Sequence, residues 1–272
     1  MKSKRIAVAI GVLAACSGSA FAQLIVGNDQ SAPAIWDVDV TGSRAPKSLL
    51  SGSAAVVYGM AYDPTSAQLY WNNGAGLYRA PAGESKLGPS LIGSIRDGAR
   101  MLNITGLAFR PSTGRLLGFE NGPSPRLFDI DPETAVGQFA ASCSGFDFGG
   151  LDYDATTDAF YGLSDHSSSR GVYRIDPDTF AATRLADYPG TETDIDGLAA
   201  GNGRLYLVSD GSRADGGDPI WIFDLASGTY VDTIPSAFTS ATGVYAGAAF
   251  VPGPGAWALL TMAGIVAVAR KR

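Results

Sequence analysis

Short hydrophobic runs, separated by polar turns, recur along this chain at a nearly constant interval. Five glycine-led runs open the repeats, at residues 59–64, 106–111, 150–154, 197–200 and 247–252. Successive glycines are 47, 44, 47 and 50 residues apart. Each of the first four runs is followed by a tight turn and by a second, a third and a weaker fourth run. The runs are short, rich in aromatic and β-branched residues and bounded by turn residues, which is typical of β-strands.

Four short strands in every 44–50 residues predict the blades of a β-propeller. In the fifth repeat, only the first strand, at residues 247–251, comes before the end of the body. Runs at residues 24–26, 35–40 and 46–50 supply its second, third and fourth strands. The pattern therefore predicts an all-β, five-bladed propeller over residues 23–250, closed by pairing the two ends of the body, which removes exposed sheet edges. The alternatives are a β-sandwich and an open repeat array.

Two turns carry nearly the same string. Residues 130–134 read I-D-P-E-T, and residues 175–179 read I-D-P-D-T. These strings resemble the broad superfamily of YVTN/NHL-like and quinoprotein-like propellers. The resemblance implies the fold, and it leaves the function open because the superfamily hosts many activities.

The first 22 residues have the layout of a secretory signal peptide. Lys2, Lys4 and Arg5 precede an apolar run at residues 6–15, and A-F-A at residues 20–22 places cleavage between Ala22 and Gln23. The apolar run is too short to span a bilayer as a helix. An alternative is that L-A-A-C, ending at Cys16, resembles a bacterial lipobox with a lipidated cysteine. Both interpretations predict export from a bacterium.

The last 22 residues, 251–272, form a three-part tail. They read V-P-G-P at Val251, Pro252, Gly253 and Pro254, then an apolar stretch at residues 257–269, then R-K-R. This layout resembles the PEP-CTERM sorting signal, in which Glu usually stands at the position of Gly253. The resemblance implies an exosortase-type processing partner, a transient inner-membrane anchor and a destination in the cell envelope or extracellular matrix. The alternative is a plain C-terminal anchor, with the terminal cations on the cytoplasmic side.

The net charge of the chain argues against some classes of binding partner. The chain has 20 Lys and Arg and 26 Asp and Glu, for a net charge of −6. The two terminal segments hold six of the cations and no acid, so the body alone carries −12. A body this acidic repels phosphate backbones, which argues against nucleic-acid binding. Two Cys cannot form a disulfide framework, and a single His excludes a multi-histidine metal site.

The loops between second and third strands differ most among the repeats. They span residues 29–34, 72–76, 121–125, 165–170 and 210–219, and each begins with Asp or Asn. An Asx residue at every such position predicts turns set by side-chain bonds to the backbone. The longest loop carries Asp210, Asp215 and Asp218 among glycines, which suits Ca²⁺; the alternative is a solvated loop. Turn chemistry also accounts for Asp63, Asp131, Asp176 and Asp178 on the opposite face.

Inner-strand carboxylates are the candidates for catalysis. Asp152 stands where the other repeats have Ala, while Asp194 and Asp196 come just before the fourth glycine-led run. Carboxylates that converge from inner strands are able to act as general acid and base. The alternative is a buried Asp bonded to neighbouring backbone amides.

Two functions remain open on the sequence alone. The first is a non-catalytic binding propeller for a glycan, a cation or a protein, with Ca²⁺ as the one cofactor that the pattern raises. The second is a secreted hydrolase or lactonase-like enzyme that uses the inner-strand carboxylates. No diagnostic motif of an enzyme family is present.

Overall fold

The computed structural model describes residues 22–209, 219–238 and 243–253. Residues Ala22–Pro252 form one compact unit. The predicted signal peptide, the loop of Asp210, Asp215 and Asp218, and most of the tail lie outside the described residues. Within the described part of the chain, no helix is long and apolar enough to cross a membrane.

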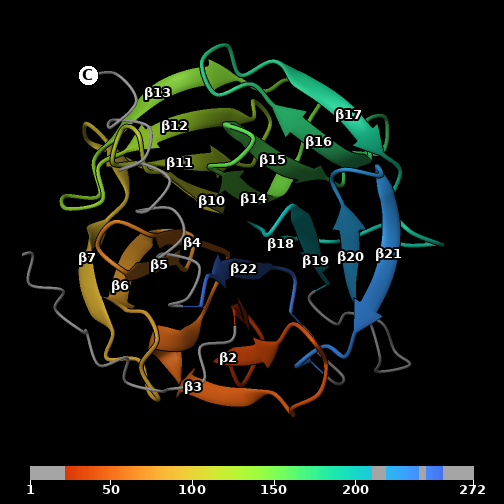
Figure 1. Ribbon diagram of the computed structural model, residues 1–272. Helices are drawn as coiled ribbons and strands as arrows, with labels where there is room; N and C mark the ends of the chain where they lie inside the picture. Colours follow the sequence, from red (N-terminus) through yellow and green to blue (C-terminus); the bar gives the residue numbers. More distant parts are fainter. Residues whose placement is uncertain (1–21, 210–218, 239–242, 254–272) are drawn as a thin grey trace, which may run out of the picture. The chain divides into compact units, whose positions relative to one another are not determined.

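The described strands form five four-stranded antiparallel sheets arranged as blades around a ring (Figure 1). Blade 1 consists of β22 (Ala246–Val251), β1 (Gln23–Asn28), β2 (Ala34–Asp39) and β3 (Lys47–Ser51). Blade 2 consists of β4 (Gly59–Asp63), β5 (Gln68–Asn72), β6 (Gly76–Pro81) and β7 (Ser90–Ser94). Blade 3 consists of β10 (Ile104–Arg110), β11 (Arg115–Glu120), β12 (Arg126–Ile130) and β13 (Gly137–Ser142). Blade 4 consists of β14 (Phe148–Asp154), β15 (Ala159–Ser164), β16 (Gly171–Ile175) and β17 (Ala182–Ala186). Blade 5 consists of β18 (Gly197–Gly201), β19 (Arg204–Val208), β20 (Ile220–Asp224) and β21 (Thr229–Ile234).

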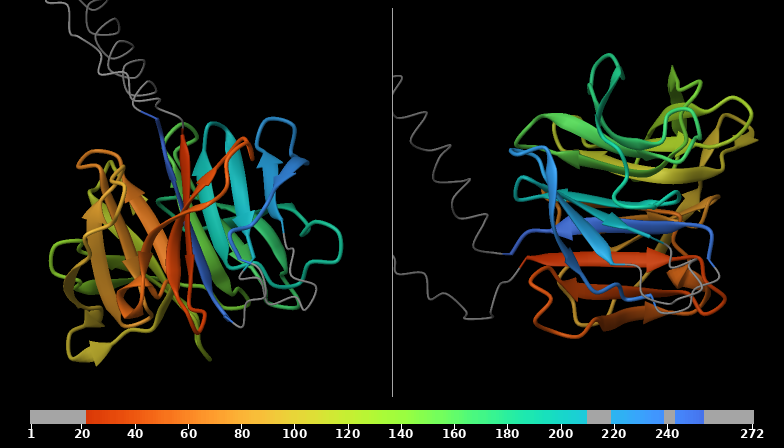
Figure 2. Two further views of the ribbon diagram at one scale, coloured as in Figure 1. Left: turned by 90° about the horizontal axis from the view of Figure 1, so that it is seen from below. Right: turned by 90° about the vertical axis from the view of Figure 1, so that its right-hand side faces the viewer.

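The two ends of the body close the ring. β1 pairs antiparallel with β22, so that Leu24 lies opposite Phe250 and Val26 opposite Ala248. Figure 2 shows the two strands side by side, β1 in red and β22 in blue. The innermost strands β22, β4, β10, β14 and β18 each contact the next, and β18 contacts β22 again. The predicted five-bladed propeller, with one C-terminal and three N-terminal strands in a shared blade, is confirmed.

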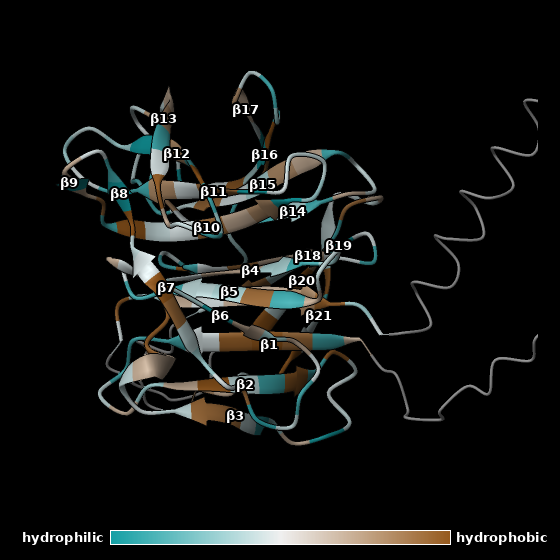
Figure 3. Ribbon diagram, turned by 90° about the vertical axis from the view of Figure 1, so that its left-hand side faces the viewer, coloured by the Kyte–Doolittle hydropathy of each residue, from teal (hydrophilic) through white to brown (hydrophobic). Residues whose placement is uncertain are grey.

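The core lies between the blades. Five apolar clusters are formed by the described residues, and each joins two neighbouring sheets. In β1, Leu24 and Val26 face blade 5, whereas Ile25 faces blade 2, because side chains alternate between the two faces of a sheet. Both faces of a blade are therefore buried, and most residues of its inner strands are apolar. Figure 3 shows hydrophobic bands along the strands, with hydrophilic residues mainly in the connecting loops.

Three local features depart from the repeat pattern. A hairpin of β8 (Arg96–Asp97) and β9 (Arg100–Met101) interrupts the connection into blade 3. It is anchored by Ile95 and Leu102, which are 0% and 1% exposed. A 3-10 turn, η1 (Ser53–Ala55), precedes blade 2. Strands β10 and β14 begin two residues before their glycines, through bulges that the sequence pattern did not predict.

Candidate functional site

One face of the ring carries the second-to-third strand loops and the starts of the inner strands. Strands alternate in direction within a blade, so both features meet on the same face. The residues directly before the five inner strands form what we call the inner rim. They are Tyr58, Asn103, Asp147, Asp196 and Tyr245. The inner rim thus contains two aromatic rings, one amide and two carboxylates. The rim residue differs from blade to blade, although the inner strands that follow it are alike.

Three carboxylates converge at the rim beside blades 4 and 5. Asp165 directly follows β15, while Asp194 and Asp196 lie in the segment that leads into β18. Their nearest oxygens lie within 4.8 Å of one another, and we call this group the rim triad. Asp194 is exposed and Asp165 is half-buried, whereas Asp196 is only 6% exposed. Two of the three predicted catalytic candidates thus lie together, with a third carboxylate that the sequence analysis had assigned to a turn.

Backbone contacts hold the triad in place. The Ile195 amide donates a hydrogen bond to Asp165 Oδ1 at 3.2 Å, which ties the loop after β15 to the segment before β18. Space for Asp196 comes from Gly149 in β14, because a Cβ at that position would overlap Asp196 Oδ1. The Asp196 carboxylate can therefore occupy this position only if residue 149 is glycine.

The rim triad has a strongly negative environment. Burial raises the pKa of Asp165 to about 7, and repulsion from Asp194 and Asp147 adds to the rise. The Tyr188 hydroxyl and the Ile195 amide oppose it. Partial burial also raises the pKa of Asp194, although its side chain keeps access to solvent and Arg170 counteracts the rise. The pKa of Asp147 is raised as well, by burial and then by Asp194. The unfavourable free energy of crowding these charges favours a proton or a cation at the rim.

A buried tyrosine lies behind the triad. Tyr188 is 7% exposed, and its pKa is raised well above the usual value by burial and by the charges of Asp165 and Asp196. Its hydroxyl is near enough to Asp165 for the two groups to interact electrostatically.

The opposite arc of the rim is aromatic. The rings of Tyr58 and Tyr245 lie 4.4 Å apart between centroids, with an angle of 35° between their planes. Asp29 fixes the second ring, because its Oδ1 accepts hydrogen bonds from the amides of Val244, at 2.8 Å, and Tyr245, at 3.1 Å. Negative charge also reaches this arc, since burial and then Asp196 raise the pKa of Tyr245. Aromatic rings beside carboxylates are suited to stack against sugar rings or cationic groups.

The predicted Asx turns are only partly found. Asn73 Oδ1 accepts a hydrogen bond from the Gly76 amide at 2.8 Å, as a local turn requires. Asp29 and Asp165 instead bond to the segments that lead into β22 and β18. A position occupied by Asx in every repeat thus serves two purposes, closing its own loop in one blade and tying two segments together in others.

Asp152 lies apart from the triad. It is 7% exposed, and its carboxylate accepts hydrogen bonds from the amides of Ala200, at 2.7 Å, and Tyr153, at 2.8 Å. The bond to the Ala200 amide joins β14 to β18, and burial raises the pKa of Asp152 to about 8. Its position is three residues beyond Gly149, or about 10 Å along the strand from the level of Asp196. The arrangement matches the alternative of a buried carboxylate bonded to backbone amides.

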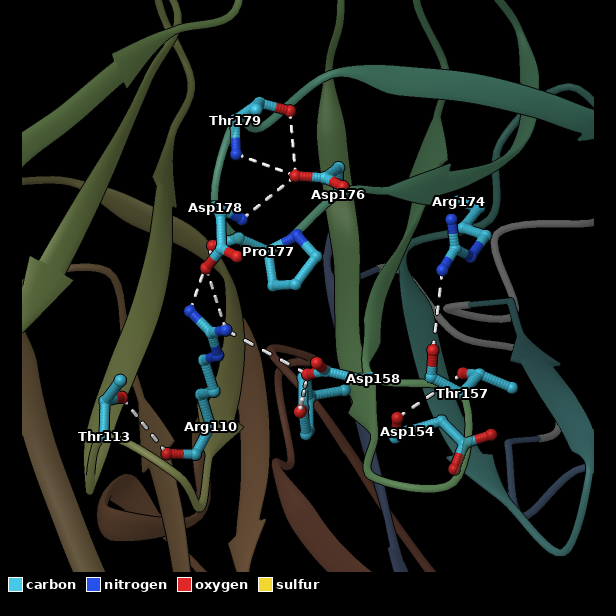
Figure 4. A network of polar contacts seen from close by, with 11 residues as sticks. Arg110, Thr113, Asp154, Thr157, Asp158, Arg174, Asp176, Pro177, Asp178 and Thr179 are labelled. Atoms are coloured by element: carbon cyan, nitrogen blue, oxygen red, sulfur yellow. Dashed lines mark hydrogen bonds and ion pairs between the residues drawn. The ribbon is translucent and has the colours of Figure 1, made fainter.

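The opposite face consists of turns, as expected. Asp176 Oδ1 accepts hydrogen bonds from the amides of Asp178 and Thr179, and Asp63 does the same for Thr65. Asp178 departs from the expectation, because its carboxylate reaches Arg110 of the neighbouring blade at 3.0 Å (Figure 4). The Arg110 guanidinium also donates to the Pro177 carbonyl at 3.1 Å, so this network joins blades 3 and 4. These contacts are structural.

Only part of the site was predictable from the sequence. Asp194 and Asp196 were identified because they interrupt the repeat. Asp165 was interpreted as a turn residue because every equivalent loop also begins with Asp or Asn. Asp147 and Tyr188 carried no signal in the sequence pattern, because neither belongs to a repeated string. Asp147 directly precedes its inner strand, as Asp196 does. The repeats were aligned on their glycines, however, and the bulge at the start of β14 places Asp147 three residues before Gly150, so the alignment did not match it with Asp196.

Comparisons with known proteins establish the fold alone. No protein-family model matches the chain, and no curated protein matches it. A chain in the crystal structure of a nidogen/laminin complex is similar, with a TM-score of 0.57 and 15% identity over 84% of this chain and 98% of that one. TolB from Acinetobacter baumannii has a TM-score of 0.52 and 16% identity, over 86% of this chain and 67% of that one. A putative TolB from Agrobacterium tumefaciens has a TM-score of 0.50 and 12% identity, over 86% of this chain and 100% of that one. The chain thus has a β-propeller fold similar to those of TolB and the nidogen/laminin chain.

Proposed function

We propose that this protein is an exported, non-catalytic binding propeller whose ligand lies on the face that carries the inner rim. The observation that carries the proposal is the convergence of Asp165, Asp194 and Asp196 on the same face as the variable loops. Loops that vary on a rigid scaffold are the usual location of binding residues. The rim adds an aromatic arc, whereas the turns of the opposite face are engaged in local or blade-to-blade contacts.

The charge of the body defines the class of ligand. A net charge of −12 outside the terminal segments, concentrated at the rim by the triad and Asp147, disfavours anionic ligands. A neutral polysaccharide or a basic protein segment fits both the carboxylates and the Tyr58–Tyr245 pair. One of the similar structures is a protein–protein complex, which supports the use of this type of scaffold in binding.

The test is a binding screen of the full-length chain against neutral polysaccharides, basic peptides and anionic polysaccharides. We expect binding of a neutral or basic ligand that Asp194→Asn weakens at least fivefold. Thr65→Ala and Thr113→Ala on the opposite face serve as matched controls and are expected to leave it unchanged. Binding that survives Asp194→Asn but is lost in the two threonine variants would place the ligand on the other face.

Export and sorting are part of the proposal. The signal-peptide layout of residues 1–22 and the V-P-G-P tail from Val251 support secretion, transient anchoring in the inner membrane and processing by an exosortase-type enzyme. Mass spectrometry of the mature protein tests all three. We expect an N-terminus at Gln23 and loss of the residues after the V-P-G-P motif. A diacylated Cys16 would support the lipoprotein alternative, and an intact Arg272 would contradict processing.

A hydrolase is the second candidate function, favoured by one observation. The nearest oxygens of the triad lie within 4.8 Å of one another, so two of its carboxyl groups are close enough to act on one bond, and the pKa of Asp165 is raised to about 7. In that case Asp165 acts as the general acid, and Asp194 or Asp196 as the nucleophile. A panel of chromogenic glycosides and lactones tests this candidate. Turnover lost in both Asp165→Asn and Asp194→Asn would support the enzyme, and no turnover on the panel supports the binding module.

A further inference from the structure

We propose that Gln23 is a modification site. As the N-terminal residue of the mature chain, it cyclises to pyroglutamate while β1 is outside the sheet, and Asp37 keeps it uncyclised in the folded ring. The inference rests on the export proposal, which places signal-peptide cleavage between Ala22 and Gln23. It concerns the face opposite the inner rim, because β1 starts on that face and runs to the loop that precedes β2 on the rim face.

An N-terminal glutamine carries a nucleophile and an electrophile on one residue. The neutral α-amino nitrogen attacks Cδ of the side-chain amide, a C–N bond forms, the bond between Cδ and Nε2 breaks, and ammonia leaves. One proton passes from the α-nitrogen to the leaving nitrogen, so the atoms balance without a co-reactant. The α-amino group has an ordinary pKa of about 7.7–8.0, so much of it is neutral at pH 8. Closure of the five-membered lactam requires the side chain to fold back onto its own backbone nitrogen.

In the folded ring, the Gln23 side chain reaches the neighbouring strand instead. Its Nε2 donates a hydrogen bond to Asp37 Oδ2 at 3.2 Å. Asp37 lies on β2 and is 3% exposed, and Arg44 Nη2 pairs with the same oxygen at 3.0 Å. The acceptor is therefore fixed both by its burial and by an ion pair. A glutamine amide held by this carboxylate is directed across the sheet, away from the conformation that closes the lactam.

The strand pairing and the charge around Gln23 act in the same direction. Gln23 lies between two strands, opposite Val251 of β22 and Asp39 of β2. Hydrogen bonds from the Thr41 amide and the Ser43 hydroxyl lower the pKa of Asp39, so its carboxylate stays ionised. An ionised carboxylate opposite the N-terminus favours the protonated α-ammonium, which is not a nucleophile.

The N-terminus therefore has two states. When β1 is outside the sheet, the amide and the amine are free, and Gln23 cyclises. When β1 is paired, both groups are held and the α-ammonium persists. The lactam has neither the side-chain NH₂ that bonds to Asp37 nor a positive charge, so the cyclised chain is expected to have a lower Tm than the uncyclised one.

The test compares cyclisation in the folded chain with cyclisation in an unfolded reference. The chain from Gln23 to Arg272, which contains every described strand, is released from a leader by a protease that leaves no extra residue. Mass spectrometry at pH 8 follows the loss of ammonia from the N-terminal peptide. We expect the folded chain to cyclise at least tenfold more slowly than the same chain in guanidinium chloride or a synthetic peptide of residues 23–28.

Variants of Asp37 test its part as a positioning residue. Asp37→Ala removes the acceptor and is expected to cyclise at least fivefold faster than the wild type under native conditions, at an unchanged rate in guanidinium chloride. Asp37→Asn keeps an acceptor oxygen and loses the charge, so its rate is expected to lie between the two. Asp232→Asn, an exposed acid on β21, is the matched control and is expected to cyclise like the wild type.

Three outcomes would overturn the inference. The first is an equal rate in the folded chain and in the peptide. The second is a wild-type rate in Asp37→Ala, or in Asp37→Asn if the alanine variant lacks a cooperative unfolding transition. The third is equal acceleration in Asp232→Asn, which would reduce the effect to net charge. An exported protein whose N-terminus is not Gln23 contradicts the cleavage site of the proposed function instead, and leaves the rates measured on the released chain unchanged.

Discussion

Asp152 shows how a single polar residue joins two blades. The equivalent position in the other four blades is Ala61, Ala108, Ala199 and Ala249. In blade 4 a carboxylate reaches the Ala200 amide of β18 and replaces apolar packing by a hydrogen bond. A buried carboxylate of this kind is tolerated because it is hydrogen-bonded, and the protonated form is favoured over the charged one.

The raised pKa of Asp152 predicts a pH dependence of stability. The folded-state pKa is about 8 against an ordinary 3.8, so the folded chain holds a proton that the unfolded chain has released between these values. The contribution of Asp152 is complete below pH 3.8, falls as the pH rises to about 8 and is then constant. At about 1.4 kcal/mol for each pKa unit, we expect a loss on the order of 6 kcal/mol across this window. Urea unfolding from pH 4 to pH 9 measures it.

Asp152→Asn removes the titrating group, so its curve of unfolding free energy against pH is expected to be flatter than that of the wild type. The exposed variant Asp232→Asn is expected to keep the wild-type slope. Equal slopes in Asp152→Asn and in the wild type would show that Asp152 does not carry the effect.

Gly149 controls the rim triad through the space it leaves. Gly149→Ala is expected to push the Asp196 carboxylate away from its position, because the new Cβ would overlap Oδ1. We expect Gly149→Ala to lower the free energy of unfolding by about 1–3 kcal/mol, because the buried Asp196 carboxylate has to move. Gly88→Ala is the matched control, since a Cβ at residue 88 has no neighbour within 4 Å. Urea unfolding compares the two variants, and an equal loss of stability in both would contradict the role of Gly149.

At the scale of elements, the periodic parts of the chain were predictable and the connections between them were not. All five inner strands and the closing partnership of β1 with β22 follow from the spacing of apolar runs. The β8–β9 hairpin was missed because each strand has only two residues, too few to show a period. Two residues of the rim triad, Asp194 and Asp196, were predicted because they depart from the repeated sequence pattern. Asp165 was missed because it follows the pattern of an Asp or Asn at the start of each loop. Convergence in space depends on loop paths, which a repeat pattern does not encode.

Closure of the ring makes β1 essential to stability despite its place near the chain start. Leu24 is 0% exposed and lies between Val38 of β2 and Phe250 of β22. Leu24→Ala is expected to lower the free energy of unfolding by about 2–5 kcal/mol, through lost burial and the cavity left behind. Leu91→Ala on the outer strand β7, where Leu91 is 59% exposed, is expected to change it by less than about 0.5 kcal/mol. Thermal and urea unfolding compare the pair.

Removing residues 23–50 deletes three strands of blade 1 and exposes β22 and the apolar faces of both neighbouring blades. We expect this deletion to abolish cooperative unfolding. A deletion variant with the Tm of the full-length chain would contradict the closed ring.

At the scale of the whole molecule, the two faces of the ring differ in how far their carboxylates are paired with amides or with basic side chains. On the opposite face, carboxylates such as Asp176 and Asp178 are engaged by backbone amides or by Arg110. At the rim, Asp194 is exposed and Asp165 is half-buried, and neither forms an ion pair with a basic side chain among the described residues. Among the described residues, the rim carboxylates are therefore less compensated by ion pairs than the carboxylates of the opposite face.

This asymmetry predicts how binding responds to salt. A cationic probe, such as a hexalysine peptide, is expected to bind the full-length chain more weakly as NaCl rises from 20 to 200 mM, because the Debye length falls to less than about 10 Å. A neutral polysaccharide should show no such slope, since its contacts are stacking and neutral hydrogen bonds. Asp165→Asn with Asp194→Asn should flatten the hexalysine slope, because two of the rim charges are gone. Asp176→Asn with Asp178→Asn changes the net charge equally and should leave most of the slope. If the two double variants flatten the slope to the same extent, the probe senses the net charge of the body, and the rim is not its binding site.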